Sequence, residues 1–251
     1  LRWHRKAGFR MKIIMPIVGS GTEKERSPYI RSLYEIQKKT ILQYVYESLS
    51  QIEGAEFIVI VRREEVRNYH LDDMIRLLIP DCEVIISDGA TQGAACSCLL
   101  AVDLIHDEEP LIIAGGDQLM LENPQTVVSE FWKHGYDAGA VVFEDIHPRW
   151  SYVRLGKDGL VAEAAEKRPI SKNATTGFYY FRHGKYFIHA VEEMIRKGAS
   201  VNGQYYVCPC FNELVLEHKK IGVYQISKME YFHFGQPKSM DDYERYLKGG
   251  K

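Results

Sequence analysis

Lys12-Ile-Ile-Met-Pro-Ile-Val-Gly-Ser-Gly21 is the stretch of sequence that decides the fold. Its first seven residues are mostly apolar, as expected of a strand covered on both faces. Gly19, Ser20 and Gly21 follow as a loop of small residues whose backbone N–H groups can approach a ligand closely. A loop at the carboxyl end of the first parallel strand usually binds phosphate in an open α/β sheet. The stretch therefore predicts a nucleotide-binding sheet, although two glycines alone are equally compatible with an ordinary turn.

Composition places the chain among ordinary globular proteins. It has 251 residues, of which 45% are hydrophobic and 26% charged, with a formal net charge of −2. A near-neutral balance gives no electrostatic reason to expect nucleic acid or an anionic membrane as a partner. No apolar run approaches the roughly 18 residues that span a bilayer, and no secretory signal is recognisable. We therefore expect a cytoplasmic protein, with Met11 as a candidate natural start and residues 1–11 as an N-terminal extension.

The five cysteines allow one alternative to a purely structural role. An odd number without a signal sequence argues against a disulfide framework. Two C-x-C pairs could together offer four thiolates to zinc, but zinc sites usually use C-x2-4-C spacing. Free cysteines are common core residues. The cysteines are Cys82, Cys96, Cys98, Cys208 and Cys210.

Strands and helices alternate through the first half of the chain. This alternation predicts a parallel sheet with right-handed crossovers. The expected strands are 12–18, 56–61, 83–86, 110–114 and 138–143, and the expected helices are 39–52, 71–79, 92–105 and 124–134. After about residue 145 we expect strands at 151–155, 160–165, 176–181, 221–226 and 229–234, and helices at 185–197, 210–217 and 239–247.

The absence of a linker or low-complexity run favours one continuous domain over residues 12–251. Within it, residues 12–145 form the expected nucleotide-binding half. Residues 146–251 then build a lobe over the sheet.

Several short motifs follow the glycine loop in an informative order. A basic insert comes first, and a loop that opens a helix comes second. An apolar strand then ends in an acidic residue, and two polar segments close the series. The motifs are Arg26-Ser-Pro-Tyr-Ile-Arg31-Ser-Leu33, Thr91-Gln-Gly-Ala-Ala95, Ile112-Ile-Ala-Gly-Gly-Asp117, Glu166-Lys167-Arg168-Pro169 and Ala174-Thr-Thr-Gly-Phe-Tyr179.

This order resembles the sugar-nucleotide pyrophosphorylases, nucleotidyltransferases of the NTP-transferase family that make NDP-sugars from an NTP and a sugar 1-phosphate. The likeness extends from Lys12 to Leu247. Asn202-Gly-Gln-Tyr-Tyr-Val-Cys-Pro209 is similar to a motif of the capsule and lipopolysaccharide sugar nucleotidyltransferases. The resemblance implies a Rossmann-like α/β fold, the nucleotide-diphospho-sugar transferase fold. This fold has a mixed, mainly parallel sheet flanked by helices and a small C-terminal sugar-binding lobe.

The resemblance also implies roles for individual residues. Arg31, Asp117 and Lys167 are the implied catalytic residues. The implied nucleotide-binding residues are Gly19, Ser20, Gly21, Arg26, Gln92 and Gly93. The implied sugar-phosphate-binding residues are Gly116, Glu166, Lys167, Thr176 and Gly177. Asp117 is the implied Mg²⁺ ligand, and His233 stands where many members carry a second metal-binding aspartate.

The implied reaction needs no nucleophilic side chain. A phosphate monoester is already an anion near pH 7, because its second pKa is about 6. Catalysis would rest on positioning and on neutralising phosphate charge. The implied partners are an NTP and a sugar phosphate, with Mg²⁺ as cofactor and a homo-oligomer as one arrangement.

The chain departs from the family pattern at four places. Thr22 and Glu23 follow the glycine loop where the family has an arginine, and Arg26 is a candidate substitute. Arg31 replaces a lysine, Gly235-Gln-Pro237 replaces G-T-P, and His233 replaces the second aspartate. Mg²⁺ prefers oxygen to imidazole.

These departures leave two other functions open. One is a nucleotide- or sugar-phosphate-binding protein without catalysis. The other is a glycosyltransferase on the same fold, although Asp117-Gln118-Leu119 offers only one acid of a D-x-D motif.

Single residues have plainer interpretations as well. Asp117 could instead be a helix N-cap or a turn residue, which is the less favoured interpretation. Glu166-Lys167-Arg168 could be a solvated charge run, and Lys38-Lys39 a solvated helix start. The aromatic pair Tyr205-Tyr206 is more typical of core packing than of a sugar platform.

Overall fold

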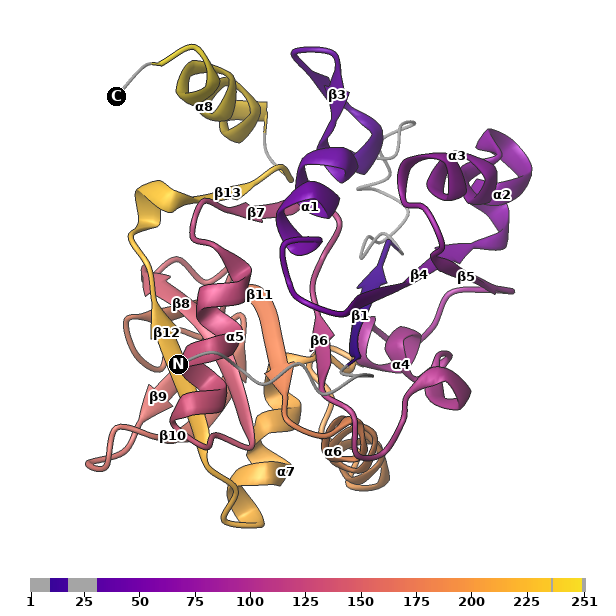
Figure 1. Ribbon diagram of the computed structural model, residues 1–251. Coiled ribbons are helices and arrows are strands. Elements are labelled where there is room, and N and C mark those ends of the chain that lie inside the picture. Colours follow the sequence, from indigo (N-terminus) through magenta and orange to yellow (C-terminus); the bar gives the residue numbers. More distant parts are fainter. Residues whose placement is uncertain (1–9, 18–30, 236, 250–251) are drawn as a thin grey trace.

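A single mixed sheet of nine strands forms the centre of the protein (Figure 1). The computed structural model describes residues 10–17, 31–235 and 237–249. The strands of this sheet are β1 (Met11–Pro16), β4 (Ala55–Arg62), β5 (Glu83–Ser87), β6 (Leu111–Ile113), β8 (Ala138–Glu144), β9 (Ser151–Leu155), β10 (Val161–Glu166), β11 (Asn173–Phe181) and β12 (Ile221–Gln225).

The sheet combines a parallel part with an antiparallel insertion. Along its main path the order is β10-β9-β11-β6-β1-β4-β5, and β8 lies between β11 and β12. Strands β6, β1, β4 and β5 are mutually parallel, and β12 runs parallel to β8. Strand β11 pairs antiparallel with both β6 and β8, so segments before and after residue 145 share one sheet. The prediction of a mixed, mainly parallel sheet flanked by helices is confirmed.

Helices cover both faces of the sheet, and each face has its own hydrophobic core. One core contains buried residues of α1 (Ile41–Leu49), α3 (Leu71–Leu78) and α5 (Pro124–Lys133). The other contains residues of α4 (Ala94–Leu99), α6 (Gly184–Arg196) and α7 (Phe211–Leu216). Strand β1 serves both, because Ile13 faces the first core and Ile14 the second. This alternation follows from the two-residue period of a strand.

Three of the helical segments differ from the predicted elements. The predicted helix 39–52 is shorter, because Lys39–Thr40 form strand β3, which pairs with β2 (Glu35–Ile36). The predicted helix 92–105 is broken into α4 and a 3-10 turn, Val102–Leu104. Helix α2 (Arg63–Tyr69) was not predicted, since none of its residues is buried and its sequence carries no apolar period.

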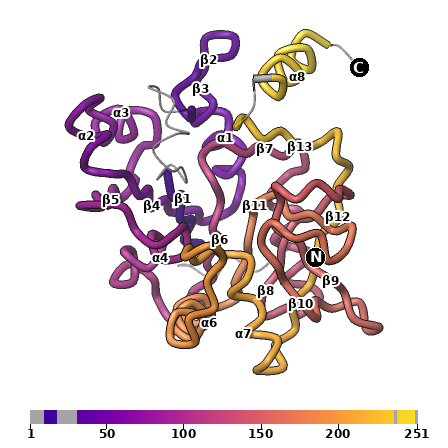
Figure 2. The backbone as a smooth tube through the Cα atoms, turned by 180° about the vertical axis from the view of Figure 1, so that it is seen from behind, coloured from indigo at the N-terminus to yellow at the C-terminus, as the bar shows by residue number. Residues whose placement is uncertain are grey.

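A second small sheet joins distant parts of the chain. Strand β7 (Gln118–Met120) pairs antiparallel with β13 (Tyr231–His233), which follows the 3-10 turn Lys228–Glu230. Helix α8 (Pro237–Leu247) lies beyond β13, and both views place it beside the β2–β3 hairpin (Figures 1 and 2). Tyr243 of α8 packs edge-on against Tyr44 of α1, with ring centroids 5.1 Å apart. This packing ties the C-terminal helix to the edge of the sheet where β1 ends.

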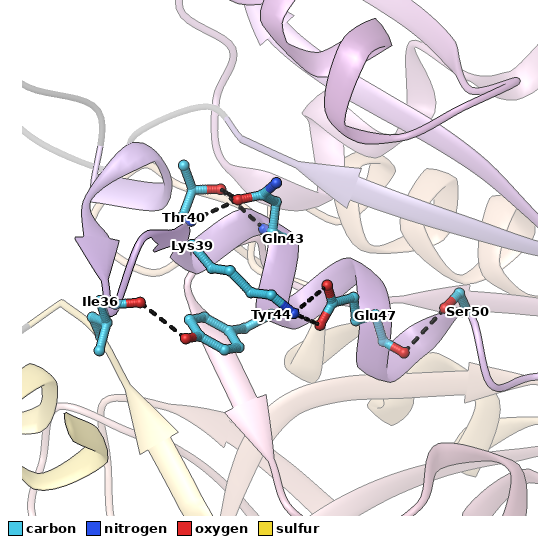
Figure 3. A network of polar contacts seen from close by, with 7 residues as sticks. All are labelled: Ile36, Lys39, Thr40, Gln43, Tyr44, Glu47 and Ser50. Atoms are coloured by element: carbon cyan, nitrogen blue, oxygen red, sulfur yellow. Dashed lines mark hydrogen bonds and ion pairs between the residues drawn. The ribbon is translucent and has the colours of Figure 1, made fainter. Parts of the chain in front are cut away.

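The start of α1 is held by side-chain contacts (Figure 3). The backbone N–H of Gln43 donates to the Thr40 hydroxyl at 3.1 Å, and the N–H of Thr40 donates to the Gln43 side chain at 2.8 Å. This reciprocal pair is a capping box. The Lys39 ammonium donates to the Glu47 carboxylate at 2.7 Å. Lys39 therefore belongs to a solvated helix start, whereas the exposed Lys38 lies in the hairpin turn.

The hairpin turn stores strain that a substitution should relieve. Gln37 and Lys38 both have positive φ, 48° and 68°, in the left-handed region. That region costs a non-glycine residue roughly 1–2 kcal/mol, which glycine avoids. Glycine also makes the unfolded chain more flexible, and this entropy offsets part of the gain. We expect Lys38→Gly to raise the free energy of unfolding by about 0.5–1 kcal/mol. Denaturant unfolding would measure it. Lys38→Ala removes the same charge but keeps the strain, so an equal gain from Lys38→Ala would contradict this explanation.

The five cysteines are free thiols. Cys98, Cys208 and Cys210 are buried in the core beneath α4 and α7, and Cys82 and Cys96 are half-buried. Among the described residues no group of three or more histidine, cysteine or acidic side chains could hold a metal ion. The zinc alternative therefore has no support in the structure.

Helix length bears on membrane insertion. Within the described ranges, none of the helices is long and apolar enough to cross a bilayer.

Candidate active site

Asp117 lies in a tight turn at the carboxyl end of β6. Gly116 and Asp117 form this turn, and β7 begins at the next residue. Asp117 is therefore a turn residue and not a helix N-cap. A side chain at Gly116 would meet Ile17, the residue that follows β1, at 3.1 Å. This close approach brings the turn against the end of the central strand, at the edge where parallel sheets usually bind ligands.

Pairing of β7 with β13 brings His233 to Asp117. His233 lies opposite Gln118 in the ladder, and the N–H of Phe234 donates to the Asp117 carbonyl at 2.9 Å. Burial lowers the pKa of His233, while the charge of Asp117 raises it. Two residues more than 100 positions apart in sequence therefore lie close together.

Two arginines also act electrostatically on this site, because the positive charges of Arg149 and Arg31 both lower the pKa of His233. The Arg149 guanidinium stacks on Trp150, 4.6 Å from the ring centroid, and Trp150 in turn packs edge-on against His233. Among the described residues, no ion pair joins either arginine to a carboxylate. Two guanidinium groups at one site are suited to binding a polyanion.

The donor set at this site fits a divalent cation only in part. Asp117 supplies one carboxylate, and His233 supplies an imidazole, a nitrogen donor that Mg²⁺ disfavours. Mg²⁺ commonly takes one or two carboxylates and completes its shell with water and substrate phosphate. A single carboxylate is compatible with a Mg²⁺ ion that is also bound by water and substrate phosphate. It is too few ligands for a site built from protein groups alone.

Gln92 and Gly93 form a loop that is fixed from behind by a distant segment. The N–H of Tyr205 donates to the Gln92 carbonyl at 2.7 Å, and the N–H of Ala95 donates to the Tyr205 carbonyl at 3.0 Å. Gly93 has a φ of 110°, and a Cβ there would lie 2.4 Å from the Tyr205 carbonyl oxygen. Only glycine fits this backbone and this approach. The Gln92 side chain itself is exposed and free to meet a ligand.

Glu166 is a buried acid at the end of β10. It is 9% exposed and accepts a hydrogen bond from the Ser151 hydroxyl. Burial raises the pKa of Glu166, and the Ser151 hydrogen bond and the Lys167 charge act against this rise. Glu166 also raises the pKa of the buried Tyr179, which places it beside that phenol. Glu166 is thus not part of a solvated charge run, although Lys167 and Arg168 are exposed.

The raised pKa of Glu166 has a consequence for stability. The folded protein holds this proton more tightly than the unfolded chain, so the stabilising contribution is complete below the unfolded pKa and is lost as pH rises through the folded pKa. We expect Glu166→Gln to melt at a higher temperature than the wild type at about pH 8, and the difference to vanish toward about pH 4. Thermal melts across that range would measure it. Glu163→Gln, on the same strand but paired with Arg154 and Arg168, should show no such gain; a gain there of equal size would contradict the explanation.

Lys167 follows Glu166 in a left-handed backbone conformation, with a φ of 53°. Its N–H donates to the Trp150 carbonyl at 3.0 Å, and its ammonium donates to the Tyr206 hydroxyl at 3.2 Å. Tyr206 adjoins Tyr205, which holds the Gln92 loop. The predicted sugar-phosphate lysine therefore contacts Tyr206, and the predicted base-binding loop is hydrogen-bonded to the adjacent Tyr205.

Thr176 and Gly177 lie on β11 against the Asp117 turn. The Thr176 hydroxyl is buried and donates to the Val141 carbonyl at 3.3 Å, so it is already engaged within the protein. A Cβ at Gly177 would lie 1.9 Å from Oε1 of Gln118. That oxygen has no hydrogen-bond partner among the described residues, and Gln118 is one of the residues that line a cavity of about 20 Å³, large enough for one water.

Not every predicted site residue can be placed. Gly19, Ser20, Gly21 and Arg26 lie outside the described residues. Arg149, Trp150 and Tyr206 reach the site but were not predicted. The segment Arg149-Trp150 belongs to no recognisable motif, and the sequence of the aromatic pair Tyr205-Tyr206 is more typical of core packing.

Comparison with known proteins identifies the family to which the chain is related. The nucleotidyl transferase family model matches residues 28–220. A curated relative, the bifunctional protein GlmU of Thermotoga maritima, is 23% identical over 209 residues, covering 80% of this chain. The chain spans only 44% of that relative's length.

Solved structures share the fold. The nucleoside-diphosphate-sugar pyrophosphorylase of Vibrio cholerae RC9 superimposes with a TM-score of 0.77 at 21% identity, covering 94% of this chain and 99% of that one. A UDP-glucose pyrophosphorylase complexed with UDP-glucose gives a TM-score of 0.73 at 15% identity, covering 97% and 100% of the two chains.

Proposed function

The chain belongs to the nucleotidyl transferase family, and from this we propose that it joins an NTP to a sugar 1-phosphate with release of pyrophosphate. The observation that carries the proposal is the charge arrangement around Asp117. The Asp117 carboxylate, in the turn after β6, and the guanidinium groups of Arg31 and Arg149 all act on the charge of the His233 imidazole. A triphosphate is the kind of ligand that such a set of charges would bind.

The bond changes follow from the chemistry of the two substrates. An oxygen of the sugar phosphate forms a bond to the α-phosphorus of the NTP. The bond from that phosphorus to the bridging oxygen of the β-phosphate breaks, and pyrophosphate leaves with the electron pair. Because the attacking oxygen is already anionic near neutral pH, no general base is needed. The protein has to hold two anions in line and neutralise them.

Each candidate residue then has a task in the proposal. Arg31 and Arg149 neutralise charge on the phosphates, with bidentate geometry available to a guanidinium. Gln92 and the backbone of Gly93 contact the base. Lys167 binds the sugar phosphate, and the Glu166 carboxylate accepts hydrogen bonds from sugar hydroxyls.

Asp117 would hold a divalent cation in this reaction. We propose Mg²⁺, which binds phosphate oxygens alongside few carboxylates and supplies electrostatic stabilisation of the charge on the leaving group. Asp117 fits this role because its carboxylate and the two arginines act on the same residue, His233.

The product fits a biosynthetic role. We propose that the NDP-sugar supplies surface-polysaccharide assembly, of capsule or lipopolysaccharide, from the cytoplasm. The segment Asn202–Pro209, which resembles that of capsule and lipopolysaccharide nucleotidyltransferases, supports this narrower proposal.

A second candidate function is ligand binding without catalysis. It is favoured by His233, which offers nitrogen where many relatives of this kind carry a carboxylate. Such a protein would bind an NTP but release no pyrophosphate.

The direct test is pyrophosphate release from ATP, CTP, GTP, UTP and dTTP, each with Mg²⁺ and a panel of sugar 1-phosphates. Release with a particular NTP and acceptor would establish the transferase and name its substrates. Silence across the panel, with an NTP still raising the melting temperature, would favour the binding protein. Silence without any thermal shift would contradict both functions.

A further inference from the structure

Lys167 and Tyr206 form a pair at the edge of the candidate site. The Lys167 ammonium lies 3.2 Å from the Tyr206 hydroxyl oxygen and 5.3 Å from the centroid of the same ring. The lysine is exposed and the tyrosine half-buried. An exposed lysine side chain ordinarily samples many rotamers, so two contacts to one aromatic residue restrict the volume that its ammonium occupies.

The backbone directs Lys167 to this position. Glu166 turns inward to Ser151, and the next residue adopts a φ of 53°. A left-handed conformation is costly for lysine and persists where its surroundings fix it. Here the Lys167 N–H is fixed by the Trp150 carbonyl, next to the residue whose guanidinium faces His233. The strained backbone is thus that of Lys167, the residue whose ammonium the candidate site needs on its surface.

Tyr206 is carried by a segment with little freedom. Val201 and Gln204 exchange two backbone hydrogen bonds, of 2.9 and 3.0 Å, around the turn Asn202-Gly203, in which both residues have positive φ. On the other side of Tyr206, the buried 3-10 turn Cys208–Cys210 packs into the core. A tight turn on one side and a core anchor on the other hold the ring in place.

The same segment holds the predicted base-binding loop. Tyr205 donates its N–H to Gln92 and accepts from Ala95, while the adjacent Tyr206 accepts from Lys167. Two substrate-facing elements, more than 70 positions apart in sequence, are therefore set relative to each other by two consecutive tyrosines.

We propose that Tyr206 is a positioning residue that holds the Lys167 ammonium ready for the phosphate of the sugar phosphate. The inference rests on the proposed function for the identity of the ligand. Tyr206 itself does not contact the reacting atoms. Its effect is to reduce the conformational entropy that the Lys167 side chain loses when the sugar phosphate binds after the NTP.

The kinetic test replaces Tyr206 with phenylalanine, which keeps the ring and removes the hydroxyl acceptor. We expect KM for the sugar phosphate to rise about 3- to 10-fold, the range of one net hydrogen bond. KM for the NTP should remain unchanged, because the backbone contacts of Tyr205 are retained. An unchanged KM for the sugar phosphate, or an equal rise for both substrates, would overturn the proposal.

Tyr186→Phe is the matched control. Lys219 lies 4.3 Å above the Tyr186 ring, a comparable lysine–tyrosine pair formed by α6 and the connection between α7 and β12. The same substitution there should leave both KM values unaltered. A rise in the sugar-phosphate KM from Tyr186→Phe would show that the effect is general and would count against Tyr206.

A second readout separates this proposal from the proposed function. Lysines labelled with ¹³C-methyl groups by reductive methylation give separate NMR signals, and Lys167→Arg identifies that of Lys167. We expect the Tyr206→Phe substitution to shift and sharpen this signal as the ammonium is released. An unmoved signal would overturn the positioning role even in an active enzyme. If the signal moves in a protein that releases no pyrophosphate, the contact between Lys167 and Tyr206 is supported and only the proposed reaction is rejected.

Discussion

Pyrophosphate release is expected to fall by at least about 100-fold when Asp117 is replaced by asparagine, the size of effect seen when one preorganised electrostatic group is removed. Asp117 is the acid in the β6–β7 turn, and its charge acts on His233 together with the charges of Arg31 and Arg149. Removing its charge leaves none of these four groups with a negative charge to balance a divalent cation. Steady-state assays with the substrate pair that gives the fastest release would measure the loss.

The fold should survive the same change. The Asp117 backbone carbonyl still accepts from the Phe234 N–H, and asparagine has nearly the same shape. Melting temperatures should therefore agree closely, as for most substitutions outside the core. Asp103→Asn, in an exposed 3-10 turn, is the matched control and should keep full activity. Wild-type rates in Asp117→Asn protein would remove Asp117 from the mechanism.

Gly93→Ala should give the largest loss of stability among changes at the site. The new Cβ would lie 2.4 Å from the Tyr205 carbonyl oxygen and 2.7 Å from its nitrogen, and the glycine φ of 110° is closed to alanine. Backbone atoms cannot rotate away as a flexible side chain can. We expect the free energy of unfolding to fall by about 2–4 kcal/mol, from strain and overpacking together.

NTP binding should also be affected by the displacement of the Gln92 loop in the Gly93→Ala protein. If the Gln92 loop and the 201–206 segment separate, the thermal shift produced by an NTP should diminish as well as the starting melting temperature. Gly89→Ala is the control within the same connection, because a Cβ there meets nothing within 4 Å. Equal stability of the Gly89→Ala and Gly93→Ala proteins would show that Tyr205 does not hold the loop.

The strands of the parallel part were predictable because burial on two faces leaves a plain apolar signature. Strands β1, β4 and β8 lie where their sequences place them, within two residues at either end. Strand β7 was missed, since three residues after a turn carry too little pattern to be distinguished from a loop. The position of β11 between β6 and β8 depends on contacts across the chain, which local sequence does not encode.

The candidate site divides in the same way. Asp117 and Lys167 follow recognisable strands and belong to motifs, so the family resemblance was enough to select them as candidates. Arg149 lies near His233 through the packing of Trp150, and Tyr206 reaches Lys167 because two distant turns meet. Neither proximity has a signature in linear spacing.

The distribution of thiols offers an intrinsic probe of local opening. Burial raises the pKa of all five cysteines, and for Cys98, Cys208 and Cys210 it does so in the core beneath α4 and α7. The nucleophile in alkylation is the thiolate, so these sulfurs react only when the surrounding structure transiently exposes them. Cys208 and Cys210 adjoin the segment that carries Tyr206, whereas Cys82 precedes β5 at the far edge of the sheet. The alkylation kinetics of each cysteine would therefore map which parts of the molecule breathe together, without the introduction of any label.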